Sequence, residues 1–133
     1  MEEIDLYLEK INNNVLKSTD IDLIVKMMQE DTKKGRIKSE KDDLQWFDLY
    51  KFGLDELELS LRGGSKMRVG DWRQNLDYSK ARFFVDDMEE KGLINNVSWH
   101  TQGVVIFDIP NPEVYRIHLC HKIREHLCKL YCI

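Results

Sequence analysis

Apolar residues recur every three or four positions through the first half of the chain, which is the spacing of one face of an amphipathic helix. This spacing predicts a first helix over residues 3–17 and a second that begins at Ser18 or Thr19 and ends near Gly35. A third helix is expected over residues 39–62. The first part of the chain is therefore predicted to be helical.

The pattern changes after the glycine pair at residues 63–64. A short strand, a short helix over residues 69–75, a tight turn and a longer helix over residues 79–91 are expected in that order. Ser79 can cap the longer helix, and Gly92 ends it. Two helices joined by a tight turn predict a helix-turn-helix, whose second helix lies in a DNA groove.

Residues 97–100 and 104–109 are rich in β-branched and aromatic side chains, which predicts the two strands of a hairpin. Beside a helix-turn-helix, this hairpin is expected to be the wing of a winged helix. Two prolines then end the second strand, and helical spacing resumes over residues 113–131. This last helix is expected either to fold back on the chain or to form a homodimer through residues 113–133.

The predicted fold class is thus mostly α, in three consecutive regions. An acidic helical region covers residues 1–62, and a winged helix-turn-helix with a small β-hairpin covers residues 63–110. A C-terminal amphipathic helix occupies residues 111–133.

Residues 66–94 resemble the C-terminal gamma domain of bacterial septal DNA translocases, a winged helix that binds short DNA orientation sequences. The matching positions are Tyr78, Lys80, Ala81, Val85, Met88, Glu89, Gly92, Leu93 and Ile94. The resemblance implies a winged-helix fold, with the region around Tyr78 in the major groove. The sequence has no counterpart of the ATPase motor that such domains normally follow, which favours a small protein of a phage or mobile element.

The net charge of −4 argues against a nucleic-acid partner, but the distribution of the charges matters more than their sum. Residues 1–61 hold 15 acidic and 9 basic side chains, whereas residues 62–82 hold six basic and two acidic ones. The basic block therefore coincides with the predicted helix-turn-helix. An acidic cluster follows directly and is expected to face solvent, away from any groove: Asp86, Asp87, Glu89 and Glu90.

The candidate DNA contacts come from this basic block and from the hairpin. They are Lys66, Arg68, Arg73, Tyr78, Ser79, Lys80, Arg82, Trp99, His100 and Gln102. Lys80 and Arg82, in the first turn of the predicted recognition helix, can reach a phosphate or the acceptor edge of guanine. The three hairpin residues are expected to make secondary contacts to the flanking backbone or minor groove.

The sequence contains neither a phosphate-binding loop nor a nucleophile elbow, so we expect no enzymatic activity and no cofactor. Six residues near the chain end suggest a zinc site, but their spacing along one helix favours buried thiols and solvated histidines over a metal. They are His118, Cys120, His121, His126, Cys128 and Cys132. Four aromatic side chains within residues 46–52 favour core packing over a base-stacking platform.

Composition favours a cytoplasmic protein. The chain is 42% hydrophobic and 33% charged, as in soluble globular proteins, and no apolar run is long enough to span a bilayer. Its acidic N-terminus lacks the pattern of a signal peptide, and an odd number of cysteines agrees with a reducing compartment.

Two functions remain open. The first is binding of double-stranded DNA, as a phage or mobile-element regulator or a replication or partition factor. The second is a protein-interaction module on a winged-helix scaffold, such as a phage-encoded inhibitor of a host nucleic-acid enzyme. A continuous basic face over the recognition helix and wing favours DNA, whereas acidic patches beside it favour a host protein partner.

Overall fold

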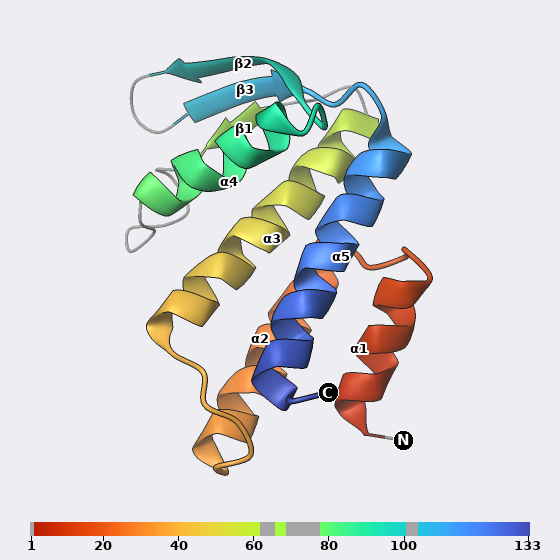
Figure 1. Cartoon of the computed structure of the whole chain (residues 1–133), viewed down its shortest axis with the longest axis vertical. Coiled ribbons are helices and arrows are strands. Elements are labelled where there is room, and N and C mark those ends of the chain that lie inside the picture. The colour runs from red at the N-terminus through yellow and green to blue at the C-terminus, as the bar shows by residue number, and fades with distance from the viewer. Residues whose placement is uncertain (1, 62–65, 69–77, 101–103) are drawn as a thin grey trace. The chain divides into compact units, whose positions relative to one another are not determined.

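The computed structural model describes residues 2–61, 66–68, 78–100 and 104–133, with the backbone alone described for residues 66–68. Its elements, labelled in Figure 1, are α1 (Glu3–Asn12), α2 (Ser18–Lys33), α3 (Lys41–Leu61), β1 (Lys66–Arg68), α4 (Tyr78–Glu90), β2 (Asn95–His100), β3 (Val104–Asp108) and α5 (Pro112–Tyr131). The mostly helical class predicted from the sequence is confirmed. No helix among the described residues is long and apolar enough to cross a bilayer.

The chain forms two compact units. Unit 1 contains residues 1–54 and 116–133, and unit 2 contains residues 55–115. Helices α3 and α5 therefore each contribute to both units, and the units do not follow the three consecutive regions expected from the sequence.

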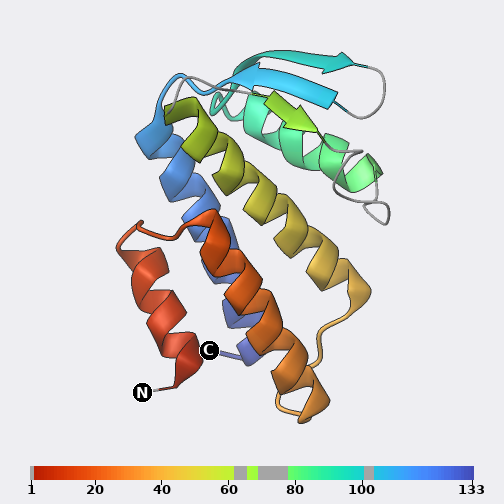
Figure 2. The ribbon, with the colours of Figure 1, turned by 180° about the vertical axis from the view of Figure 1, so that it is seen from behind.

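Unit 1 is a bundle of helical segments from α1, α2, α3 and α5, which lie side by side in Figures 1 and 2. Its core consists of apolar side chains from all four segments, among them Ile11, Ile24, Met28, Phe47, Leu49, Leu119, Ile123 and Leu127. The C-terminal helix thus buries most of its apolar face within its own chain, although Val114 and Ile117 remain exposed. Two arrangements were expected for this helix, and the structure shows the one in which the helix folds back on the chain.

Two helix boundaries in unit 1 differ from the sequence prediction. Helix α1 ends at Asn12 rather than near residue 17, because Asn14 takes a positive φ of 55°. The backbone N–H of Val15 then bonds to the carbonyl of Lys10, which closes the helix. Val15, expected on the buried face, is consequently 54% exposed.

Aspartates in the first turns of α2 and α3 bind backbone N–H groups at the start of each helix. Asp20 accepts the backbone N–H of Lys17 at 2.9 Å, and Asp43 accepts that of Glu40 at 2.8 Å. A carboxylate in the first turn binds a free backbone donor and also faces the positive end of the helix dipole. Helix α3 begins at Lys41, two residues after the start expected from the sequence.

Unit 2 contains a three-stranded antiparallel sheet of order β1-β3-β2. The predicted hairpin is confirmed: β2 pairs with β3, with Trp99 opposite Val105. Asn96 has a positive φ of 53° where the register of β2 shifts. Strand β1 pairs with the other edge of β3, a contact between distant segments that the sequence pattern did not indicate.

Helix α4 lies against one face of this sheet (Figures 1 and 2). The face predicted to be apolar is buried and consists of Ala81, Phe84, Val85 and Met88. Gly92 ends the helix as predicted, at a φ of 73°, and the N–H of Leu93 bonds to the carbonyl of Met88 at 2.9 Å. The short helix expected over residues 69–75 lies outside the described residues.

Candidate nucleic-acid interface

The structure brings together predicted DNA contacts from two separate elements of unit 2. Tyr78, Ser79, Lys80 and Arg82 occupy the first turn of α4 and the start of the next, and Trp99 and His100 end β2. Ser79 lies within the first turn of α4 rather than before it, so it is not the cap that the sequence predicted. Of the remaining predicted contacts, Lys66 and Arg68 belong to β1, where the backbone alone is described, and Arg73 and Gln102 lie outside the described residues.

Tyr78, Arg82 and Trp99 form what we call the aromatic–arginine cluster. The guanidinium carbon of Arg82 lies 4.4 Å from the centre of the Trp99 ring. The rings of Tyr78 and Trp99 meet edge to face with centroids 5.7 Å apart. A guanidinium over an indole ring is held by cation–π attraction and by flat stacking. The cluster therefore fixes a cation between the helix and the hairpin.

The cluster is accessible to a partner. The side chain of Arg82 is 42% exposed, and Tyr78 is 52% exposed. Arg82 also makes a long hydrogen bond to the Tyr78 hydroxyl at 3.4 Å and lies 4.0 Å from an Asp86 oxygen. These weak contacts leave guanidinium donors available for a further acceptor.

Phe83 and His100 extend the surface around the cluster. Phe83 is 62% exposed although its neighbour Phe84 is buried. His100 is exposed, and its Nε2 lies 3.1 Å from the Ser98 hydroxyl. Phe83 was not among the contacts predicted from the sequence. Its position next to the apolar face of α4 could have indicated a side chain at the edge of that face, within reach of a partner.

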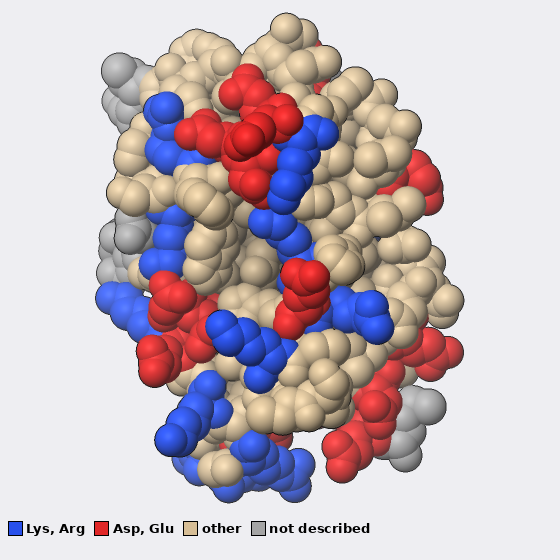
Figure 3. Space-filling model, viewed as in Figure 1, with Lys and Arg blue, Asp and Glu red and all other residues tan. Residues whose placement is uncertain are grey.

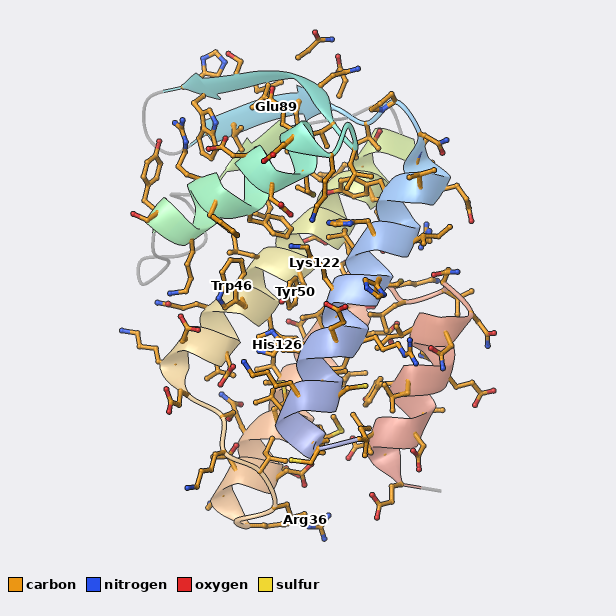
Figure 4. All side chains as sticks on the ribbon, viewed as in Figure 1. Arg36, Trp46, Tyr50, Glu89, Lys122 and His126 are labelled. Atoms are coloured by element: carbon orange, nitrogen blue, oxygen red, sulfur yellow. The ribbon has the colours of Figure 1, made fainter. Side chains whose placement is uncertain are left out.

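The second half of α4 is acidic. Asp86, Glu89 and Glu90 are exposed, while Asp87 is half-buried and bonds to Lys91 at 3.0 Å. Figure 3 shows acidic side chains gathered over this part of the helix, and Figure 4 labels Glu89 there. Within the described residues, the surface of α4 thus changes from basic to acidic along the helix and is not continuously basic. Of the two outcomes expected from the sequence, this is the one that favours a protein partner, and a DNA contact is left only the first turn of α4 and the adjoining hairpin.

Unit 2 also buries a carboxyl group. Glu56, on α3, is 2% exposed, and its Oε1 atom makes no hydrogen bond within the part of the chain that the structure describes. Burial, and secondarily the neighbouring carboxylate of Asp55, raises the pKa of Glu56 to about 8. The pKa of the fully buried Tyr115 is raised as well, first by burial and then by the charge of Glu56. Glu56 is therefore protonated at neutral pH.

Unit 1 contains a chain of partly buried polar groups that the sequence did not indicate. His126 Nε2 lies 2.8 Å from the carboxylate of Asp43, and His126 Nδ1 lies 2.9 Å from the Tyr50 hydroxyl. Figure 4 shows Tyr50 and His126 pointing toward each other from α3 and α5. Burial is the main cause that raises the pKa of Tyr50, so its phenol stays protonated and is a poor nucleophile. This arrangement connects α3 and α5 within unit 1.

The C-terminal histidines and cysteines are dispersed. Cys120 is buried, and burial raises the pKa of its thiol, whereas Cys132 is exposed. His121 is exposed and pairs with Glu125 at 2.8 Å, but the His126 side chain is only 14% exposed, contrary to the expectation of solvated histidines. No three His, Cys, Asp or Glu side chains within the described ranges are grouped as a metal ion requires.

Comparison with known proteins gave no match to a protein-family model, a curated protein or a solved structure. The function is therefore inferred from the geometry of this chain.

Proposed function

We propose that unit 2 is a winged helix that binds double-stranded DNA through the first turn of α4 and the β2–β3 hairpin. The observation that carries the proposal is the aromatic–arginine cluster, in which candidate contacts from the predicted recognition helix and the predicted wing meet. The order of elements supports it: a strand precedes α4, a hairpin follows it, and β3 pairs with both other strands.

The chemistry of the cluster suits a phosphate or a base edge. An arginine already held over an indole ring loses less side-chain entropy when its forked N–H groups bind two acceptors. Lys80, two positions before Arg82 in the sequence, adds a flexible point charge. In this proposal Arg82 sets the geometry of the contact and Lys80 adds attraction to the phosphate backbone.

The acidic half of α4 limits how DNA can approach. Asp86, Glu89 and Glu90 would repel phosphates, so the contact is confined to the N-terminal end of the helix and the adjoining hairpin. Reading with the N-terminal residues of a recognition helix is a common geometry of helix-turn-helix proteins. DNA binding of this kind is expected to be modest in affinity and strongly weakened by salt.

A second candidate is binding to a protein, and a specific observation favours it. Tyr78 and Phe83 are 52% and 62% exposed on the same helix that carries the acidic residues. Tyrosine, tryptophan and arginine are enriched among residues that dominate protein interfaces. A protein partner with a basic, partly apolar surface would complement this face.

The test replaces Lys80 and Arg82 by alanine and measures binding of duplex DNA by fluorescence anisotropy at two salt concentrations. Lys91→Ala is the control for a single charge, because Lys91 is an exposed cation directly after the opposite end of α4. The double variant is expected to fold normally and to lose about 1–3 kcal/mol for each base contact. If the double variant folds and binds duplex DNA as the parent does, the proposal fails and the protein partner becomes the better explanation.

A further inference from the structure

Unit 1 carries its own cationic surface at the turn between α2 and α3. Residues 33–41 contain five basic side chains and one acidic one. Part of this segment lines a surface hollow, and Lys129 of α5 lines the same hollow. We call Lys33, Lys34, Arg36, Lys38, Lys41 and Lys129 the turn patch. Figure 3 shows basic side chains gathered at this turn, at the bottom of the view, and Figure 4 labels Arg36 there.

The lysines of the turn patch are not used to hold the fold. All five are exposed, and none makes an ion pair or a side-chain hydrogen bond with any residue that the structure describes. Arg36 alone has an acidic partner, Asp31, at 3.6 Å, and its side chain remains 67% exposed. The charges are therefore available to a ligand.

Helix-end electrostatics explain only part of the patch. Lys33 and Lys34 end α2, where cations stabilise the negative end of the helix dipole. Lys41, however, opens α3, where the dipole disfavours a cation, and Lys38 lies in the turn itself. Folding gives no reason for these last two charges.

The patch surrounds a surface hollow of about 570 Å³, lined by Arg36, Lys38 and Lys129. Two acids also line it, Glu40 and Asp43. The carboxylate oxygens of Asp43 accept the Glu40 backbone N–H and contact His126, each at 2.8 Å, so this acid is already engaged. With Asp43 engaged, three cations and one exposed carboxylate, that of Glu40, remain at the hollow, which leaves an excess of positive charge there.

We infer that the turn patch binds the phosphate backbone of nucleic acid without sequence preference. Flexible lysines suit phosphates as point charges and carry no base readout. Protein interfaces, in contrast, are depleted in lysine. Membrane-binding segments add exposed apolar side chains to their cations, whereas Ile37, the large apolar residue of this segment, is 7% exposed. This inference does not rest on the function proposed for unit 2.

The test compares two doubly substituted full-length proteins. Lys38→Gln/Lys129→Gln removes two charges from the turn patch, and Lys17→Gln/Lys26→Gln removes two exposed charges elsewhere in unit 1. Affinity for a random-sequence duplex is measured from about 50 to 200 mM salt. The patch variant should show a log–log salt slope shallower by roughly 1–2, close to one for each phosphate that the protein no longer neutralises. The control should match the parent.

The outcomes separate this inference from the function of unit 2. If Lys80→Ala/Arg82→Ala loses binding and the patch variant keeps the parent slope, the inference is overturned while the proposed function stands. If the salt slope becomes shallower in the patch variant while Lys80→Ala/Arg82→Ala binds as the parent does, the inference stands and the proposed function fails. An equal loss in the Lys17/Lys26 control would reduce the effect to net charge and overturn the inference. The inference would also be overturned if the turn patch binds vesicles containing phosphatidylserine while the patch variant binds duplex DNA as the parent does.

Discussion

The two units use polar and charged side chains differently. Unit 1 joins three buried or half-buried polar groups, Asp43, His126 and Tyr50, into a hydrogen-bonded chain and leaves the lysines of the turn patch in solvent. Unit 2 holds Arg82 against Trp99 and buries a carboxyl oxygen of Glu56 without a partner among the described residues. Buried polar groups that are hydrogen-bonded stabilise a fold. Stability alone does not explain why Arg82 is held on an exposed ring or why the carboxyl of Glu56 is buried without a partner among the described residues. In the functions proposed above, selective recognition is assigned to unit 2 and non-selective attraction to the turn patch of unit 1.

The largest expected effect concerns Glu56. Its raised pKa means that the folded protein holds a proton that the unfolded chain releases above about pH 4.5. The stabilising contribution of the neutral group is therefore complete below pH 4.5 and is lost as the pH rises through about 8. Above that pH, Glu56→Gln should raise the free energy of unfolding by roughly 2–4 kcal/mol, since one pKa unit is worth about 1.4 kcal/mol.

Urea denaturation at pH 5, 7 and 9 checks this prediction. The gap between Glu56→Gln and the parent should widen with pH. Glu58→Gln is the control, because Glu58 lies on the same helix, is less buried and is not among the groups that raise the pKa of Glu56. A gap that is the same at all three pH values would contradict the view that Glu56 is neutral in the folded unit.

A smaller effect is expected when the cluster loses its indole ring. Trp99→Ala removes the surface on which Arg82 lies and should weaken duplex binding by about 1–2 kcal/mol, the range of a well-packed cation–π contact. Trp99→Phe keeps an aromatic face and should restore much of that loss. Equal affinities of the alanine and phenylalanine variants, measured by anisotropy, would show that the ring does not position Arg82 for binding.

The smallest effect is expected in unit 1. Tyr50→Phe deletes the hydroxyl that bonds to His126 and should lower the free energy of unfolding by about 1 kcal/mol without changing DNA binding. Tyr7→Phe is the matched control, because Tyr7 is 5% exposed and its hydroxyl makes no hydrogen bond within the described ranges. A loss of DNA affinity in Tyr50→Phe would remove the distinction between a scaffold and a recognition unit.

Local signals in the sequence predicted much of the fold. Gly92 ends α4 because its backbone takes a positive φ, and β-branched residues form the hairpin, so both could be predicted from short segments. The end of α1 could not, because Asn14 adopts a positive φ that asparagine tolerates but does not require.

Contacts between distant segments could not be predicted. Tyr50 and His126 are 76 positions apart, and neither lies in a motif. The sequence did identify Arg82 and Trp99 as separate candidates, but it did not indicate that the guanidinium would stack on the ring. The turn patch was also missed, since cations after a helix are explained by its dipole until their lack of acidic partners is seen.

Self-association through residues 113–133 stays a prediction, and deleting that segment would not test it. Leu119, Ile123 and Leu127 are fully buried in unit 1, so the deletion would unfold the unit rather than only separate a dimer. Ile117, which is 47% exposed, is the better position to change. If the parent sediments as a dimer, Ile117→Glu should convert it to a monomer; a monomeric parent contradicts the prediction.

The most direct test of the central claim is selection of bound sequences from a random duplex pool at two salt concentrations. If the aromatic–arginine cluster and the first turn of α4 contact base edges, a short motif should be enriched at both concentrations and should disappear in Lys80→Ala/Arg82→Ala. A palindromic motif would additionally indicate a dimer. Recovery of DNA with no enriched sequence, from a protein that is folded and binds, would contradict sequence recognition by unit 2.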